Sequence, residues 1–219
     1  MNINVTEGKP AKEVALSPTL IDGLTKVPNR RYFDHFLESE WKRCSRLNSP
    51  IAFAIMKIDH FKLLNDHYGH QVGDECLMKI GAVLNKFGKR PGDLLARYGG
   101  EEFSFVFGNT TIVQSMVVIN RIIYAIAAHK IPHEKSPTKP IVTVSIGLAM
   151  MYPDRLNNVK ALIEEAGKSL YSAKANGRNG VVFNYDFKQI SAKYTELSFN
   201  YYEISRLYQS KIIPERLCR

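Results

Sequence analysis

The chain has 219 residues, of which 45% are hydrophobic and 23% charged, a composition typical of one folded globular domain with short extensions. Its net charge of +9 favours anionic ligands, nucleotides included, but zinc-finger spacings, RNA-binding aromatic signatures and dense basic runs are missing, so no nucleic-acid partner is indicated. The three cysteines, Cys44, Cys76 and Cys218, are far apart and form no CxxC pair, which indicates neither a zinc site nor a disulfide framework.

No stretch approaches the roughly 18 apolar residues of a membrane helix, and the N-terminus lacks signal-peptide order, so we expect a cytoplasmic chain with no membrane segment. Residues 1–20 indicate a linker or the stub of an upstream region, and residues 21–185 the main domain. Residues 186–219 predict a C-terminal helical extension. Its heptad stripe fits packing onto the domain or a helical dimer contact equally well, and consists of Ile190, Tyr194, Leu197, Tyr201, Ile204 and Tyr208.

Helical spacing of apolar residues predicts a first helix around residues 33–44, with Asn29 or a neighbour as its cap. The short apolar run 51–58 then predicts a buried strand, which ends at a charged loop. A second helical face begins at residue 71, follows residues 76–87 and stops at Gly88.

Two short strands, 94–97 and 103–107, flank the pair Gly99-Gly100 and predict a β-hairpin with a tight turn. Downstream, the pattern predicts a helix at 112–128, a strand at 141–149, a helix at about 156–175 and a last strand at 181–183. With one hairpin and no glycine-rich turn of the Rossmann or P-loop type, the chain is predicted to be α/β (α+β), with helices packed on a mixed central sheet.

The hairpin turn carries two adjacent carboxylates, Glu101 and Glu102, beside glycines that let a ligand approach the backbone. Two neighbouring acids repel each other unless a cation or hydrogen-bond donors offset their charges. Phosphate chemistry is one use of such a pair, and a harmless exposed hairpin tip is the alternative.

Further motifs surround this hairpin in a fixed order. They are DGLTKVPNRR at 22–31, IDHFKLLND at 58–66, GHQVGD at 69–74, RYGGEEF at 97–103, SIG at 145–147 and AKANGRN at 173–179. Together they resemble the GGDEF family over residues 22 to about 184. The resemblance implies a nucleotide-cyclase or polymerase-palm-like fold. It also implies condensation of two GTP molecules into cyclic di-GMP, with release of pyrophosphate, between the two domains of a homodimer.

The resemblance also implies roles for the hairpin carboxylates and for the guanine site. Glu101 occupies the position that binds a divalent cation, Mg²⁺ or Mn²⁺, and Glu102 the position that assists the chemistry; a Glu at the former is an accepted variant. Guanine recognition maps to Asn65 and Asp74, whose amide and carboxylate suit the donor and acceptor edge of guanine. Asp74 also fits a cap at the start of the second helix.

Phosphate contacts in the family map to Lys62, Lys174 and Arg178, and His60 and Phe61 precede Lys62 in the same substrate-binding motif. Lys174 and Arg178 are four residues apart, so they would share one face if the helix continued that far.

The departure from the family pattern is Lys57. The family strand usually ends Asp-x-Asp, and its first aspartate is the other side-chain ligand of the metal, whereas this chain has Lys57-Ile58-Asp59. Asp59 matches the second, more structural aspartate. A lysine reverses the local charge by two units, which weakens magnesium binding.

Three interpretations of Lys57 follow. Lys57 neutralises phosphate charge in a slow enzyme that uses Glu101 and the Ile58 carbonyl for the metal; or the domain is catalytically dead and still binds GTP; or the chain was altered at this position. The first interpretation predicts a weak diguanylate cyclase, and the second a GTP or cyclic di-GMP binding module.

Residues Arg90-Pro91-Gly92-Asp93 match the RxxD inhibitory site of many family members, at which bound product restrains the enzyme. Arg121 matches a second arginine that often completes that site. A diguanylate cyclase with product inhibition is therefore expected, and the binding module that Lys57 suggests is the alternative.

Overall fold

The structure is a computed structural model that describes residues 18–185. The predicted heptad stripe and nearly all of the predicted N-terminal linker lie outside the described residues. The first described element is a short 3₁₀ helix, η1 (Pro18–Leu20). None of the helices within residues 18–185 is long and apolar enough to cross a membrane.

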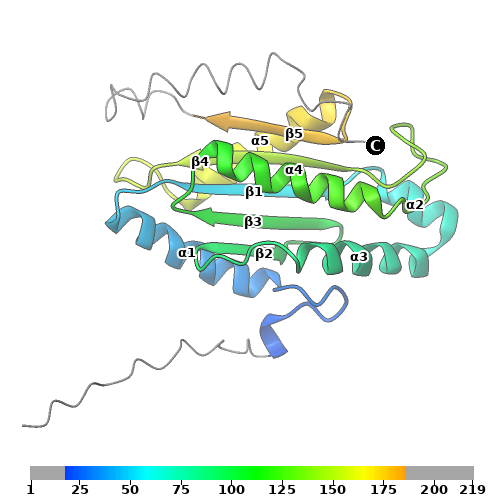
Figure 1. Cartoon of the computed structure of the whole chain (residues 1–219), viewed down its shortest axis with the longest axis horizontal. Helices are drawn as coiled ribbons and strands as arrows, with labels where there is room; N and C mark the ends of the chain where they lie inside the picture. The colour runs from blue at the N-terminus through cyan, green and yellow to red at the C-terminus, as the bar shows by residue number, and fades with distance from the viewer. Residues whose placement is uncertain (1–17, 186–219) are drawn as a thin grey trace, which may run out of the picture.

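A five-stranded mixed sheet forms the centre of the molecule, as the sequence predicts (Figure 1). Its strands are β1 (Ile51–Ile58), β2 (Asp93–Arg97), β3 (Glu102–Gly108), β4 (Val144–Met151) and β5 (Gly180–Tyr185). They lie in the order β2-β3-β1-β4-β5, in which β4 and β5 are parallel and every other neighbouring pair is antiparallel.

Helices cover both faces of the sheet. The helices are α1 (Arg30–Arg46), α2 (Phe61–Tyr68), α3 (His70–Leu84), α4 (Ile112–Ala128) and α5 (Val159–Ala175). One hydrophobic cluster joins the sheet to α3 and α4, and the other joins it to α1 and α5. In Figure 1, α4 lies in front of the sheet, α5 lies behind it, and α2 lies at the end where β1 finishes.

Alternation along β1 decides which side chains reach which layer. Ala54 and Met56 belong to the cluster with α3 and α4, whereas Phe53 and Ile55 belong to the cluster with α1 and α5. Because successive side chains of a strand point to opposite faces, Lys57 falls on the face that α5 covers. Glu102 lies directly opposite Lys57 in the β1–β3 register and shares that face.

Several local predictions are confirmed. Asn29 caps α1, since its side chain accepts a hydrogen bond from the Tyr32 amide. The helix predicted at 112–128 has those bounds and begins with a capping box at Thr111. Cys44 and Cys76 are buried, as expected of small core residues.

The charged loop predicted after β1 is wrong, because residues 61–68 form α2. Only Phe61 and Leu64 of this eight-residue helix are buried, which is too few apolar positions to reveal a helical period. The predicted cap role of Asp74 is also wrong. The following helix, α3, begins at His70, with Gly69 at the N-cap position, so Asp74 lies inside it.

Other boundaries shift by a few residues. The second predicted helix ends at Leu84 rather than near Gly88. The strand predicted from residue 141 begins at Val144, and Ile141 instead forms an isolated bridge. The helix predicted from about 156 begins at Val159, because the Asn158 side chain caps its first turn by accepting from the Ala161 amide.

Candidate functional site

The end of β1 meets the β2–β3 turn, the start of α2 and the end of α5. The Ile58 amide donates a hydrogen bond to the Glu101 carbonyl at 3.3 Å, which fixes the turn beside the strand. Lys57 pairs with Glu102 on one side and with Ser145 of β4 on the other. The structure therefore brings together the chain segments that carry most of the predicted site residues.

The Lys57 ammonium lies between the two hairpin carboxylates. Its Nζ is 3.3 Å from Glu101 Oε1 and 3.2 Å from Glu102 Oε1. Burial opposes the charge of the ammonium, but the hydrogen bond to Glu102 and the charges of both glutamates outweigh it and raise the pKa of Lys57. The three side chains are each about one-third exposed, at 31%, 32% and 30%, so a ligand in solvent can reach them.

The remaining carboxylate of the β1 motif points into the protein. Asp59 is buried and accepts hydrogen bonds from Thr143 Oγ1 at 2.7 Å, Ser145 Oγ at 2.6 Å and the Asn179 amide at 3.1 Å. These bonds occupy its oxygens and tie β1, β4 and the loop after α5 together. Asp59 is thus a structural residue, which agrees with the role expected for it.

This donor set does not fit a divalent cation. No group of three or more His, Cys, Asp or Glu side chains within residues 18–185 is arranged to hold a metal ion. Glu101 and Glu102 already hold the Lys57 ammonium, and an added cation would meet a positive charge between its two carboxylate ligands.

Two further cations stand at the end of α5. Burial, and after it the charge of Lys57, lower the pKa of Lys174, so Lys174 belongs to the same electrostatic cluster. The helix ends at Ala175, and Arg178 has a left-handed backbone with φ 64°, so the two side chains do not share a face of a continuing helix. Instead the chain turns back, and Arg178 Nη1 lies 3.4 Å from the Lys174 carbonyl oxygen.

The first turn of α2 adds His60, Phe61 and Lys62. His60 precedes the helix in the left-handed region, with φ 54° and ψ 29°. Burial, and after it the charge of Arg178, lower the pKa of His60, so the start of α2 and the loop after α5 are neighbours. The Phe61 side chain is buried and leaves only its backbone for a ligand, whereas Lys62 is exposed.

The predicted guanine residues lie where α2 packs on α3. The Asn65 Oδ1 atom is buried and has no hydrogen-bond partner among the described residues. It lies so close to Gly73 that a Cβ atom there would be 1.9 Å from it, which explains the glycine at this position. Asp74 follows Gly73 in α3 and is exposed. Because Gly73 lies against Asn65, Asn65 and Asp74 are on adjoining turns of the two helices.

An ion pair that the sequence analysis did not identify shapes the hairpin turn. Arg97 Nη2 donates to the Gly100 carbonyl at 2.8 Å, and its Nη1 lies 2.9 Å from Asp22 Oδ1. Burial opposes the Asp22 charge, but hydrogen bonds from Thr25 and Arg97 outweigh it and lower the pKa of Asp22. Because these residues are 75 positions apart, local patterns give no signal for this contact.

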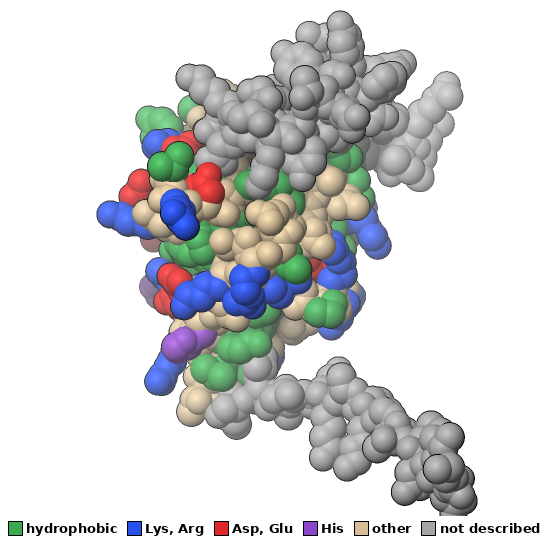
Figure 2. Space-filling view, turned by 90° about the vertical axis from the view of Figure 1, so that its left-hand side faces the viewer, with side chains coloured by type: hydrophobic (Ala, Val, Ile, Leu, Met, Phe, Trp, Pro, Cys, Tyr) green, Lys and Arg blue, Asp and Glu red, His purple; other side chains and the backbone are tan. Residues whose placement is uncertain are grey.

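The predicted inhibitory residues lie at the other end of the sheet, where β1 begins. Arg90 and Asp93 are joined by a backbone hydrogen bond of 3.0 Å. The Arg121 guanidinium lies over the Phe87 ring at 5.8 Å, and no hydrogen bond or ion pair within residues 18–185 links it to Arg90 or Asp93. Figure 2 views this end of the molecule and shows Lys and Arg side chains gathered in a band across it.

The surroundings of Asp93 disfavour the ionised form of its carboxyl group. Its Oδ1 atom is buried without a hydrogen-bond partner among the described residues. Burial raises the pKa of Asp93, the Glu40 charge adds to the effect, and the Arg90 charge opposes it. Buried carboxylate oxygens usually accept at least one hydrogen bond, so Asp93 departs from the common pattern.

The fold is an α/β domain with a cluster of opposite charges at one end of its sheet, and comparison with known proteins makes the assignment specific. A family model described as diguanylate cyclase, GGDEF domain, matches residues 19–180. The chain belongs to the GGDEF family. The predicted palm-like fold and the family resemblance are therefore confirmed.

Two relatives give the level of sequence similarity. The chain is 32% identical over 158 residues to the probable diguanylate cyclase DgcC of Escherichia coli K12, and 33% identical over 168 residues to the response regulator PleD of Caulobacter vibrioides. These matches cover 72% and 77% of this chain but 41% and 37% of the relatives. The chain thus spans about two-fifths of their length, and relatives named as diguanylate cyclases associate the family with cyclic di-GMP synthesis.

Solved structures agree. The GGDEF domain of DgcB from Caulobacter crescentus, in complex with c-di-GMP, superposes with a TM-score of 0.68 at 30% identity and covers 77% of this chain and 98% of that one. The diguanylate cyclase SiaD of Pseudomonas aeruginosa, in complex with its activator SiaC, gives a TM-score of 0.66 at 29% identity, covering 76% and 62%.

Proposed function

We propose that this chain is a guanine-nucleotide-binding GGDEF domain that holds GTP without a divalent cation and turns it over slowly or not at all. The observation that carries the proposal is the position of the Lys57 ammonium, 3.3 Å and 3.2 Å from the two carboxylates of the hairpin turn. With both carboxylates engaged, the groups expected to hold the metal and assist the chemistry are not free for that work.

The charge balance supports metal-free binding. Two carboxylates, Glu101 and Glu102, meet two ammonium groups, Lys57 and Lys174, so the centre of the site is close to neutral. With aspartate at residue 57, the same centre would hold three carboxylates against one ammonium and would repel a triphosphate unless a metal ion intervened. Arg178 supplies a further cation for phosphate oxygens.

Guanine selectivity rests on Asn65 and Asp74. An amide and a carboxylate offer the acceptor and donor set that the guanine edge requires, and adenine lacks the matching groups. The packing of Asn65 against Gly73 supports this role, because it fixes the carboxamide before a ligand arrives.

A second candidate function is a slow diguanylate cyclase, which the relatives named as cyclases favour. Such an enzyme would hold Mg²⁺ or Mn²⁺ through Glu101 and the Ile58 carbonyl and would act between the two domains of a homodimer. Turnover separates the two candidates, because both bind GTP.

A cyclic di-GMP site at Arg90 and Asp93 belongs to either function. The buried Oδ1 atom of Asp93 supports this site. It has no hydrogen-bond partner among the described residues, and the N–H groups of guanine could donate to it. In the binding module this site makes the chain a cyclic di-GMP receptor, and in the cyclase it is the site of product inhibition.

Calorimetric titration of GTP into the purified chain tests the proposal, once with EDTA and once with Mg²⁺. We expect the unmodified chain to bind GTP with similar affinity in both buffers. Lys57→Asp is expected to lose about tenfold or more in EDTA and to recover with Mg²⁺, because its added carboxylate needs a cation. Lys79→Asp, which makes the same charge change at an exposed site on α3, is the matched control and should bind as the unmodified chain does. GTP binding by the unmodified chain that requires Mg²⁺ would contradict metal-free binding.

A further inference from the structure

The segment that joins α4 to β4 holds the start of α2. His133 Nε2 lies 3.1 Å from the His60 carbonyl oxygen, and Thr138 Oγ1 lies 3.1 Å from His60 Nε2. Both the backbone and the ring of His60 are therefore fixed by this segment, of which residues 133–138 are here called the clamp loop.

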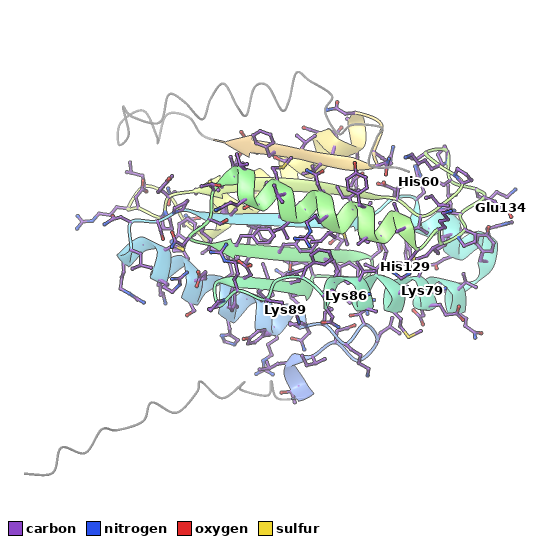
Figure 3. The ribbon with its side chains drawn as sticks, in the orientation of Figure 1. His60, Lys79, Lys86, Lys89, His129 and Glu134 are labelled. Atoms are coloured by element: carbon purple, nitrogen blue, oxygen red, sulfur yellow. The ribbon has the colours of Figure 1, made fainter. Side chains whose placement is uncertain are left out.

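The clamp loop also holds the end of α2. The Glu134 amide donates to Tyr68 Oη at 3.2 Å, and Glu134 Oε2 lies 3.7 Å from His67 Nε2. Figure 3 labels His60 and Glu134 at this end of the molecule, beside α2. The clamp loop thus contacts α2 at its N-cap residue, His60, and at its last two residues. Lys62 and Asn65 lie between these two points of contact.

The clamp loop has a defined shape of its own. The His133 amide donates to the Pro140 carbonyl at 3.0 Å, and the Val142 amide donates to the Ile131 carbonyl at 2.8 Å, which closes the base of the loop. Inside it, the Ser136 amide donates to the His133 carbonyl at 3.0 Å. A closed loop of this kind is able to fix the position of whatever it contacts.

The His133 side chain is buried and makes its hydrogen bond to the His60 carbonyl through Nε2. Its side chain is 0% exposed, and its Nδ1 has no partner among the described residues. A carbonyl oxygen only accepts, so the Nε2 atom of His133 donates to the His60 carbonyl. An apolar residue would fill this place without an orphaned nitrogen, so the contact with His60 is what the histidine provides.

The start of α2 needs such support. His60 adopts a left-handed backbone that side-chain-bearing residues disfavour, and an eight-residue helix is too short to be stable by itself. The turn and the helix carry the groups proposed to contact phosphate and guanine.

We infer that His133 is a positioning residue for nucleotide binding, which acts through the clamp loop by holding His60 and α2 in the conformation that receives GTP. The inference rests on the proposed function for its ligand, and on hydrogen bonds within this chain for its mechanism.

His133→Leu tests it, with GTP affinity measured by calorimetry in EDTA. We expect a loss of about tenfold, the weight of one well-made hydrogen bond to the backbone. His133→Gln, whose Nε2 keeps a donor at a similar reach, should restore affinity to within about twofold of the unmodified chain. His129→Leu is the matched control, since His129 is exposed on the same segment, and it should change nothing.

Amide hydrogen exchange gives a readout that needs no GTP. In His133→Leu the amides of α2 should exchange at least about tenfold faster, while those of α1 keep their rates. If the unmodified chain binds no GTP, the proposed function fails, and this exchange difference still decides the positioning role.

Unchanged affinity in His133→Leu, or unchanged exchange in α2, would overturn the inference. If His133→Leu does not fold, Thr138→Val decides, because it removes only the half-buried hydroxyl that contacts the His60 ring. We expect that variant to lose about threefold in GTP affinity, and unchanged affinity there would equally overturn the inference.

Discussion

Lys57 and Glu102 face each other across β1 and β3, and Glu101 lies in the adjoining turn, so a change at residue 57 acts directly on both carboxylates. Because the three side chains are about one-third exposed, solvent weakens the ion pairs, and their contribution to the stability of the fold is small. Their importance lies in the charge that an incoming phosphate group meets.

Replacing Lys57 by methionine tests that charge while keeping an unbranched side chain of similar length. We expect Lys57→Met to bind GTP about tenfold more weakly in EDTA, because the two carboxylates are then uncompensated, and Lys57→Arg to retain most of the affinity. Calorimetry in EDTA measures both variants. Equal affinity of Lys57→Met and the unmodified chain would show that the ammonium has no part in binding.

Asp93 supplies the second prediction at the residue scale. Its pKa is raised above the ordinary 3.8, mainly by burial, so the ionised form costs stability above the folded-state pKa and that cost disappears below about pH 3.8. Asp93→Asn should therefore raise the free energy of unfolding by about 1 kcal/mol at pH 7, with no gain at pH 3. Urea unfolding at the two pH values measures this difference.

The same variant should bind cyclic di-GMP at least about tenfold more weakly, because it loses the negative charge and puts an N–H donor in place of one of the two acceptor oxygens proposed for guanine N–H groups. A stabilised variant that has lost its ligand is typical of a functional residue. Asp93→Asn that is destabilised, or that binds cyclic di-GMP normally, would contradict the proposed role of this residue.

At the scale of the elements, the contact between α2 and α3 leaves no room for a side chain at Gly73 in the proposed nucleotide site. A side chain at Gly73 would place its Cβ 1.9 Å from Asn65 Oδ1, whereas a Cβ at Gly167, also inside a helix, would meet nothing within 4 Å. The two positions can therefore be compared directly, because packing explains the glycine at residue 73 and does not explain the one at residue 167.

Gly73→Ala is expected to weaken GTP binding about tenfold or more and to lower the thermal midpoint, because Asn65 must move to admit the methyl group. Gly167→Ala should instead stabilise the fold by about 0.5 to 1 kcal/mol and leave GTP affinity unchanged. Thermal unfolding and calorimetry on both variants measure these effects. If the two variants behave alike, the packing explanation of Gly73 is wrong.

Much of the architecture follows from local patterns in the sequence. β1 and α4 have the predicted bounds, and Asn29 caps α1 as expected, because hydrophobic periodicity and capping act over a few residues. α2 was missed because its stability comes from contacts with the rest of the protein rather than from its own sequence.

The site was predicted less completely. Motif order gave Asn65, Asp74, Glu101 and Glu102 as candidate site residues, and the unusual charge at residue 57 was visible in the strand. That the ammonium contacts both carboxylates depends on strand register and on the turn, which no pattern specifies. The contacts of His133 with His60 and of Arg97 with Asp22 join residues more than 70 positions apart. Local sequence patterns therefore did not predict them either.

For the molecule as a whole, the sites proposed for the two ligands lie at opposite ends of one sheet. The residues proposed to bind GTP surround the end of β1, and Asp93 pairs with Phe107 beside the start of β1. The two sites share no residue, so we expect cyclic di-GMP and GTP to bind together. Titration of GTP into the complex with cyclic di-GMP should give the same affinity as titration into the free chain, and mutual exclusion would show that the sites overlap or are coupled.

The central claim, that Lys57 switches off an otherwise complete site, is tested most directly by product formation. The purified chain, stripped of bound nucleotide, and its Lys57→Asp variant are incubated with GTP and Mg²⁺ or Mn²⁺, and cyclic di-GMP is measured by chromatography. We expect little or no product from the unmodified chain and at least about a hundredfold more from the variant, because the aspartate restores the second carboxylate ligand of the metal. Rapid turnover by the unmodified chain, equal to or above that of the variant, would contradict the claim and identify the protein as a cyclase that works with a lysine between its two carboxylates.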